Sequence, residues 1–201
     1  MKDKLVWVDL EMTGLDPDKD VIVEIAVLIT DSDLVPVGEG LDLVIHQPAD
    51  VLEGMEDIVR EMHARSGLTD AVLASTVTLE DAQDQALALI RQHVPAIRTA
   101  PLCGNSIATD RGFLIKYMPQ IDKHLHYRMI DVSSIKELAR RWHPKIYQQA
   151  PTKGGGHRAL ADILESVDEL RYYRSAMFVP PEVKAHGPSA APILPAPTPP
   201  G

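Results

Sequence analysis

The sequence predicts an α/β fold in which a mixed five-stranded sheet is flanked by helices. Three strand-like segments follow one another near the N-terminus, and their short links suggest an antiparallel meander. Two further strand-like segments then alternate with helical segments. Such an order is typical of a mixed sheet with helices packed on its faces. The 201 residues, 45% of them hydrophobic, are enough for one well-buried domain.

The five strands are predicted from short apolar runs bounded by turn residues. The first three are expected at 5–10 (LVWVDL), 21–30 (VIVEIAVLIT) and 35–46 (VPVGEGLDLVIH). The last two are expected at 101–105 (PLCGN) and 127–133 (YRMIDVS). A turn in TGLDPDKD separates the first strand from the second.

The helices are predicted from the spacing of apolar residues and from capping signals. Apolar residues recur at helical spacing after Met55, and this helix should stop near Gly67. A longer helix should run from Thr78 to His93, because Thr78 and Asp81 resemble a capping box. Three further helices are expected at 110–118, 134–142 and 157–178.

The composition changes abruptly near the end of the chain. Half of the 16 prolines lie in 180–201, mixed with Ala, Ser and Gly. Such a stretch has too few large apolar groups to offset the entropy lost on ordering. We therefore expect residues 1–178 to form the folded domain and residues 179–201 to be a disordered Pro/Ala-rich tail.

The charge and the cysteine count restrict the partners and the compartment. The net charge of -9 counts against an enzyme that tracks along DNA or RNA of great length, but it leaves a short substrate open. Bound divalent metals would also invert the local charge at the carboxylates. No apolar stretch approaches the roughly 20 residues of a membrane span. A single cysteine, Cys103, and an N-terminus unlike a signal peptide predict a cytoplasmic protein with no membrane partner.

Two carboxylates, Asp9 and Glu11, stand at the end of the first predicted strand. Residues at i and i+2 of a strand point to the same face, so both carboxylates should project together. A hard divalent cation such as Mg²⁺ would relieve their repulsion. A D-x-E pattern is common, however, and by itself is more often a pair of solvated acids.

Two more motifs follow much later in the chain. Asp110 is expected at the start of a helix, where it could serve an ion or act as an ordinary N-cap. His157 follows the glycines at 154–156, and Asp162 comes five residues after it. This spacing suggests a rigidly held acid beside a movable base. Taken singly, His157 and Asp162 would more often be surface residues.

In combination, these motifs resemble the signature of the DEDDh 3′→5′ exonucleases. The signature has D-x-E near the N-terminus, an Asp about a hundred residues later and H-x₄-D near the other end. The strings DLEMTGLDP, CGNSIATDRGFLIKYMPQ and HYRMIDVSSIKELARRW are similar to the oligoribonuclease family over roughly residues 4–176. The resemblance implies an RNase H-like fold for an exonuclease domain at 1–178. It also implies cleavage of short RNA, especially dinucleotides, to 5′-mononucleotides.

The resemblance further implies a two-metal mechanism. Asp9 would bridge two divalent ions, Glu11 and Asp162 would complete one site, and Asp110 would serve the other. His157 would be the general base, since an unperturbed imidazole, which titrates near ~6.5, can accept a proton from water at neutral pH. Magnesium or manganese is implied, and the oxygen-rich ligand set without cysteine argues against zinc.

Six side chains are expected to contact the substrate by the same resemblance: Leu15, His63, Ser106, Tyr127, Arg128 and Ser133. Arg128 and Ser133 would close over the 5′ phosphate, and Leu15 would be wedged between the two terminal bases. Tyr127 would reach in from the partner subunit of a homodimer. Many family members carry a tryptophan for base stacking where this chain has Ile58.

Other interpretations remain open at this stage. The chain could be another DEDDh nuclease, such as a proofreading or tRNA-trimming enzyme. It could also be a non-catalytic nucleotide-binding module, although such a module would be expected to lose at least one of the five signature residues, all of which are present. Glu24 and Asp131 interrupt apolar strands, and we expect structural hydrogen bonds from them rather than catalysis.

Overall fold

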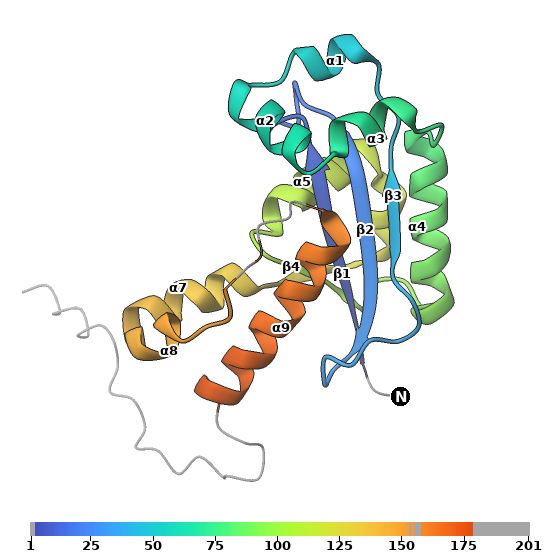
Figure 1. Cartoon of the computed structure of the whole chain (residues 1–201). Coiled ribbons are helices and arrows are strands. Elements are labelled where there is room, and N and C mark those ends of the chain that lie inside the picture. The colour runs from blue at the N-terminus through green and yellow to red at the C-terminus, as the bar shows by residue number, and fades with distance from the viewer. Residues whose placement is uncertain (1–2, 153, 155–157, 179–201) are drawn as a thin grey trace, which may run out of the picture.

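The computed structural model describes residues 3–152, 154 and 158–178. The predicted tail at 179–201 and the candidate base His157 lie outside the described residues. In the described part, helices cover both faces of one sheet (Figure 1).

The sheet contains five strands in the order β3-β2-β1-β4-β5. β1 pairs antiparallel with β2 and parallel with β4, whereas β2 and β3 are antiparallel and β4 and β5 parallel. The mixed five-stranded sheet predicted from the sequence is therefore confirmed. The strands span Lys4–Met12 (β1), Ile22–Asp31 (β2), Leu41–Val44 (β3), Pro101–Gly104 (β4) and His126–Asp131 (β5).

The helices of the described part include all those expected and several that were not. α1, α3, α6 and α8 were not predicted, because helices of five to seven residues show little periodicity. The helix expected to stop near Gly67 does so, but α3 begins directly after it. The bounds are Ala49–Glu53 (α1), Asp57–Arg65 (α2), Leu68–Ala74 (α3), Leu79–His93 (α4), Ala108–Tyr117 (α5), Pro119–His124 (α6), Val132–Trp142 (α7), Pro144–Gln148 (α8) and Ala159–Met177 (α9).

Several sequence-based boundaries were wrong. The fifth strand, expected at 127–133, spans His126–Asp131, and residues 132 and 133 already belong to α7. The third strand covers only 41–44 instead of 35–46, since the chain before it forms just one isolated bridge, between Pro36 and Thr30. The last helix begins at Ala159 rather than at residue 157. None of the described helices is both long and apolar enough to cross a membrane.

The side chains of β1 alternate between two hydrophobic cores. Val6, Val8 and Leu10 pack in the core that contains residues of α4, α5 and α6. Trp7 packs in the other core, which contains residues of α7 and α9. Because alternate residues of a strand face the same side, Asp9 and Glu11 share the face of Trp7, on which α9 lies.

The capping box predicted at the start of α4 can be tested by mutation. The capping box is present: Asp81 N donates to Thr78 Oγ1 at 3.1 Å, and Thr78 N donates to Asp81 Oδ2 at 3.3 Å. Thr78→Ala should lower the free energy of unfolding by about 1 kcal/mol, because the amide of Asp81 loses its hydrogen-bond acceptor. Urea denaturation measures this effect. Thr78→Ser, which keeps the hydroxyl, should lose much less, and equal losses in both variants would contradict the capping role.

Candidate active site

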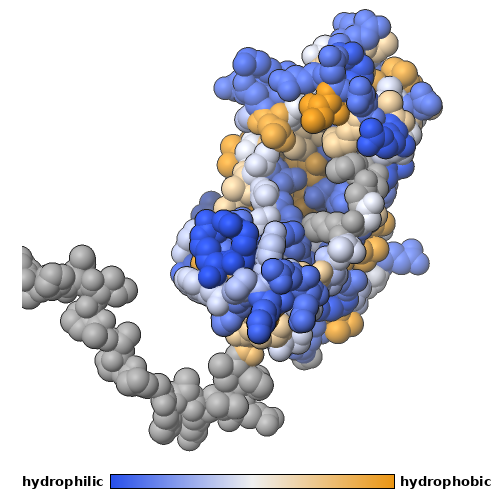
Figure 2. All heavy atoms as spheres, turned by 60° about the vertical axis from the view of Figure 1, so that its left-hand side comes forward, coloured by the Kyte–Doolittle hydropathy of each residue, from blue (hydrophilic) through white to orange (hydrophobic). Residues whose placement is uncertain are grey.

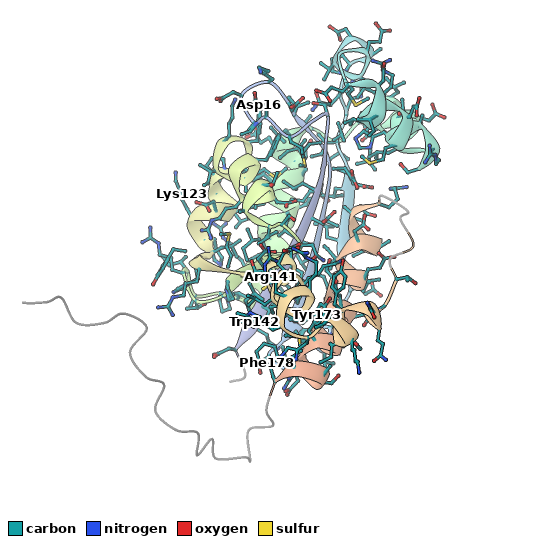
Figure 3. All side chains as sticks on the ribbon, turned by 90° about the vertical axis from the view of Figure 1, so that its left-hand side faces the viewer. Asp16, Lys123, Arg141, Trp142, Tyr173 and Phe178 are labelled. Atoms are coloured by element: carbon teal, nitrogen blue, oxygen red, sulfur yellow. The ribbon has the colours of Figure 1, made fainter. Side chains whose placement is uncertain are left out.

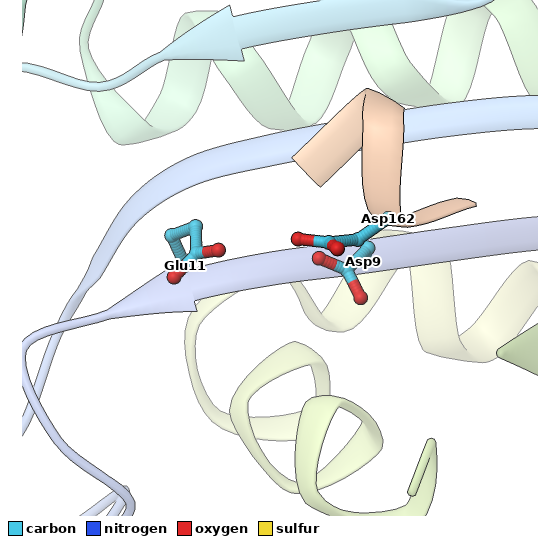
Figure 4. A group of neighbouring side chains, drawn as sticks. All are labelled: Asp9, Glu11 and Asp162. Carbon is cyan, nitrogen blue, oxygen red and sulfur yellow. The ribbon is translucent and has the colours of Figure 1, made fainter. Parts of the chain in front are cut away.

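Three carboxylates converge on the face of the sheet that α9 covers. Asp9 and Glu11 come from the end of β1, and Asp162 comes from the first turn of α9. One carboxylate oxygen from each residue lies within 4.8 Å of the others, and the three side chains point toward one another (Figure 4). The two acids at i and i+2 therefore do project together, as the sequence predicted, and α9 supplies the third.

Asp110 lies beside this cluster. Its Oδ1 accepts a hydrogen bond of 3.0 Å from Leu10 N, the backbone amide between Asp9 and Glu11. The helix cap of α5 is Ile107, so the interpretation of Asp110 as a simple N-cap is wrong. The carboxylate binds the neighbouring strand instead, which places it at the same end of β1 as the cluster.

The protonation of these carboxyl groups reflects their burial among other acids. Burial raises the pKa of Glu11 to about 8, and the negative charges of Asp162, Glu24 and Asp110 contribute to this rise. Burial also raises the pKa of Asp110 to about 7, against the hydrogen bond from Leu10 N. A cation at this place would reverse both effects. An all-oxygen donor set of this kind fits a hard divalent ion, and zinc or copper would prefer nitrogen or sulfur ligands.

An ion pair between buried Glu24 and partly exposed Arg158 holds the beginning of α9. Glu24 lies opposite Glu11 on β2 and is fully buried. Its Oε1 accepts a hydrogen bond of 2.8 Å from Arg158 Nε, and its Oε2 accepts one of 3.0 Å from Ala159 N. The structural hydrogen-bonding role expected for Glu24 is thus confirmed. The pair fixes the first turn of α9, which carries Asp162.

His63 reaches the same region from α2 but is only 2% exposed. Its Nε2 lies 2.8 Å from Met12 O, and since a carbonyl can only accept, Nε2 carries the proton. Its Nδ1 lies 3.9 Å from Glu11 Oε2. His63 is therefore buried next to Glu11 and holds the end of β1 through its hydrogen bond to Met12 O. The sequence pattern did not reveal this position.

An open hollow of about 680 Å³ lies next to the carboxylate end of β1. Leu15, in the turn after β1, and Ile58, on α2, line it and are 76% and 75% exposed. Figure 2 shows this side of the molecule hollowed between the helices α1–α3 above and α7 and α8 below. Large apolar side chains exposed in a hollow are typical of a surface that binds a ligand or a partner.

Ser106 and Ser133 meet at the ends of β4 and β5. Ser106 has a φ of 51°, in the left-handed region that non-glycine residues rarely adopt. Its amide donates to Asp131 Oδ1 at 2.9 Å and to Ser133 Oγ at 3.0 Å, and the two hydroxyls lie 3.2 Å apart. Asp131 also accepts from Ser133 N and caps α7, which confirms its expected structural role.

Tyr127 and Arg128 lie on β5, at the edge of the sheet. The guanidinium carbon of Arg128 lies 5.5 Å from the centre of the Tyr127 ring. The contacts among the described residues do not join Arg128 to Ser106 or Ser133. Farther along, Arg141 and Trp142 end α7 on the outer surface (Figure 3), where Arg141 pairs with Glu137.

Similar sequences are found over nearly the whole chain. The exonuclease family model RNase_T matches residues 6–170. A curated oligoribonuclease of Rhodococcus jostii (strain RHA1) is 62% identical over 180 residues, which are 90% of this chain and 90% of that protein. The oligoribonuclease of Nocardia farcinica (strain IFM 10152) is 59% identical over 194 residues, which are 96% of this chain and 88% of that protein.

Solved structures with a similar fold include two exonucleases I. The enzyme of Methylocaldum szegediense superposes with a TM-score of 0.59 at 19% identity over 87% of this chain. The zinc-bound E. coli enzyme in complex with single-stranded DNA gives 0.66 at 13% identity over 88% of this chain. The matched region is 41% of each of these longer chains. At such identities the likeness concerns the fold alone, and it confirms the RNase H-like fold of DEDDh exonucleases.

Proposed function

The chain belongs to the oligoribonuclease family of exonucleases, and from this membership we propose the reaction that its carboxylate cluster performs. The protein is a hydrolase, a 3′→5′ exoribonuclease that converts short oligoribonucleotides, dinucleotides above all, to 5′-mononucleotides. The observation that carries this proposal is the convergence of Asp9, Glu11 and Asp162 within 4.8 Å beside an open hollow.

The family depends on divalent metal, and we assign two ions, Mg²⁺ or Mn²⁺, to this cluster. Asp9 would contact both ions, with Glu11 and Asp162 on one and Asp110 on the other. When bound, two such ions activate the attacking water and stabilise the departing 3′ oxygen. The raised pKa values of Glu11 and Asp110 support this assignment, because buried acids crowded together need a compensating charge.

The remaining side chains position the reactants and move the proton. The Glu24–Arg158 pair holds the start of α9, so that Asp162 stays fixed relative to β1. The base we assign is His157, directly before Arg158 in the sequence, and an imidazole nitrogen would take the proton from water. His63 keeps the end of β1 in place through Met12.

The substrate would lie between the hollow and the two serines. Leu15 and Ile58 offer apolar contacts to the terminal bases, and Ile58 gives a weaker contact than an aromatic ring would, since stacking is worth roughly 1–3 kcal/mol per base. Ser106, Ser133 and Arg128 would bind the 5′ phosphate. A substrate with few phosphates suits a chain of net charge -9.

We also propose a cytoplasmic homodimer. β5 is an edge strand, and edge strands offer unpaired backbone groups to a partner. Tyr127 on this strand is 71% exposed and Met129 is 39% exposed. A second copy covering β5 would bury both side chains and would bring its own Tyr127 toward the phosphate.

Arg128→Ala tests the proposed preference for dinucleotides. A charge-assisted contact to the 5′ phosphate is worth roughly 1.5–3 kcal/mol, so kcat/KM for a 5′-phosphorylated dinucleotide should fall roughly 10- to 150-fold. Longer RNAs cannot use this contact fully and should lose less. The rates are compared on RNAs of about two to twenty nucleotides.

Arg140→Ala is the matched control, because Arg140 pairs with Glu137 on the exposed face of α7. It should leave the length profile unchanged. An equal loss at every length in the Arg128 variant would assign this residue to general phosphate attraction. That result would favour a broader DEDDh exonuclease, and a wild-type protein that binds but does not cleave would indicate a nucleotide-binding module.

A further inference from the structure

Asn105 connects the carboxylate cluster with the pair formed by Ser106 and Ser133. It lies between Gly104, the last residue of β4, and Ser106. Its Nδ2 donates to Ser166 Oγ on α9 at 2.6 Å, and its Oδ1 accepts from Ser133 Oγ at 3.0 Å. One side chain thus bridges the helix that carries Asp162 and the pair of serines at the ends of β4 and β5.

The directions of these hydrogen bonds follow from the chemistry of the partners. Ser166 Oγ donates its single proton to Asp162 O at 2.7 Å, so it can only accept from Asn105. The second group near the same nitrogen, at 3.4 Å, is the carboxylate oxygen Oε2 of Glu169, which also accepts. The amide nitrogen of Asn105 must therefore face α9, and its oxygen must face Ser133.

A continuous hydrogen-bonded chain results. It runs from Asp162 O through Ser166, Asn105 and Ser133 to the amide of Ser106. Since the Ser133 proton is directed to Asn105, the hydroxyl of Ser106 is the donor in the 3.2 Å contact between the two serines. Ser106 holds an unfavourable positive φ, which such a chain of contacts can maintain.

We propose that Asn105 is a positioning residue that determines substrate length. It fixes the distance between the carboxylate cluster and the two serines, and so selects an RNA whose scissile phosphate and 5′ phosphate are held at the same time. Only a dinucleotide with a 5′ phosphate reaches the carboxylate cluster with its scissile phosphate and the two serines with its 5′ phosphate. The inference rests on the proposed function, whose own test is cleavage of short RNA by the wild-type protein.

Asn105→Ala should lower kcat/KM for a 5′-phosphorylated dinucleotide by roughly 10- to 100-fold, since a small misplacement of a bound group can cost that much. For the same dinucleotide without the 5′ phosphate, and for a five-nucleotide RNA, kcat/KM should fall less than about threefold by the same reasoning. Neither substrate places a 5′ phosphate at the two serines while its scissile phosphate lies at the carboxylate cluster. Mn²⁺ affinity, measured by calorimetry, should stay the same. The ratio of the two dinucleotide rates is the readout that a merely structural role would not move.

Gln83→Ala is the matched control. Gln83 is also a buried amide side chain that joins two elements, accepting from Gln120 N at 3.2 Å, but it lies on α4, on the opposite face of the sheet from α9. It should cost stability and leave the ratio unchanged. Comparison of the melting temperatures of the two variants separates lost stability from lost positioning.

Ser166→Ala breaks the same chain from the side of α9 and keeps the test valid if the Asn105 variant does not fold. It should reduce the ratio in the same direction, and combining it with Asn105→Ala should add no further loss. Equal losses on all three substrates, or an unchanged ratio in both variants, would overturn the proposal. If the wild-type protein cleaves no short RNA, the proposed function itself fails, which is a different outcome.

Discussion

Replacing Glu11 with Gln is expected to abolish most activity and at the same time to stabilise the metal-free protein. The variant loses a carboxylate that would hold a divalent ion, and transition-state stabilisation of several kcal/mol by the metal corresponds to a loss on the order of 10³-fold in turnover. The gain in stability arises because Glu11 is an acid buried among acids, and its neutral form is favoured in the fold.

The pH dependence follows from the direction of the pKa shift. The pKa of Glu11 rises from 4.5 to about 8 on folding, so between these values the folded state binds more protons than the unfolded state. The stability of the metal-free protein should therefore fall as pH rises from about 4.5 to 8, and Asp110, with a pKa of about 7, contributes in the same direction. Bound Mn²⁺ should reduce this loss of stability, because a cation compensates the negative charges of the carboxylates.

Thermal denaturation from about pH 5 to 8.5, in chelator and in Mn²⁺, measures these effects. At about pH 8 the metal-free Glu11→Gln protein should melt several degrees above the wild type, at ~2–4 °C for each kcal/mol. Glu137→Gln is the control, because ion pairs with arginines lower the pKa of this exposed acid and its neutralisation should bring no gain. A Glu11 variant that is less stable at this pH would mean that the cluster needs this charge even without metal.

His157→Ala should reduce turnover by roughly 10²–10⁴-fold, the usual contribution of a general base. All four carboxylates remain in this variant, so metal affinity should be kept. Calorimetry with Mg²⁺ or Mn²⁺ decides the point, and lost affinity would make His157 a ligand instead. The fall in rate on the acidic side of the pH profile should also disappear.

His143→Ala provides the comparison for that experiment, since His143 is an exposed histidine at the start of α8. It should keep both the rate and the pH profile of the wild type. If both histidine variants lost activity equally, the effect would come from a general loss of histidine charge and not from a base.

The parts of the fold that the sequence predicted are those governed by local periodicity. The i, i+2 spacing placed Asp9 and Glu11 on one face, and the cap at Thr78 marked the start of α4. The family signature then supplied the pairing of these acids with Asp162, which no local rule could give. The substrate contacts of Leu15, Arg128 and Ser133 stay predictions.

The features that escaped prediction depend on contacts between distant segments. Asp110 was weighed as a helix cap, but its partner is the amide of Leu10 on another element. Asn105 follows an apolar strand like many loop residues, and only the packing of α9 against β4 gives it Ser166 as a partner. The short helices α1, α3, α6 and α8 contain only five to seven residues each, which is too few for a helical periodicity to be recognised in the sequence.

The position of α9 also has a consequence for the order in which the protein is made. Asp9 and Glu11 are synthesised first, whereas Asp162 is added at about 5–20 residues per second only after on the order of 10–30 s. Until then the carboxylate cluster lacks its third member. If Asp162 holds a metal ion as proposed, a nascent chain should therefore gain nuclease activity only after α9 has been synthesised and has packed on the sheet.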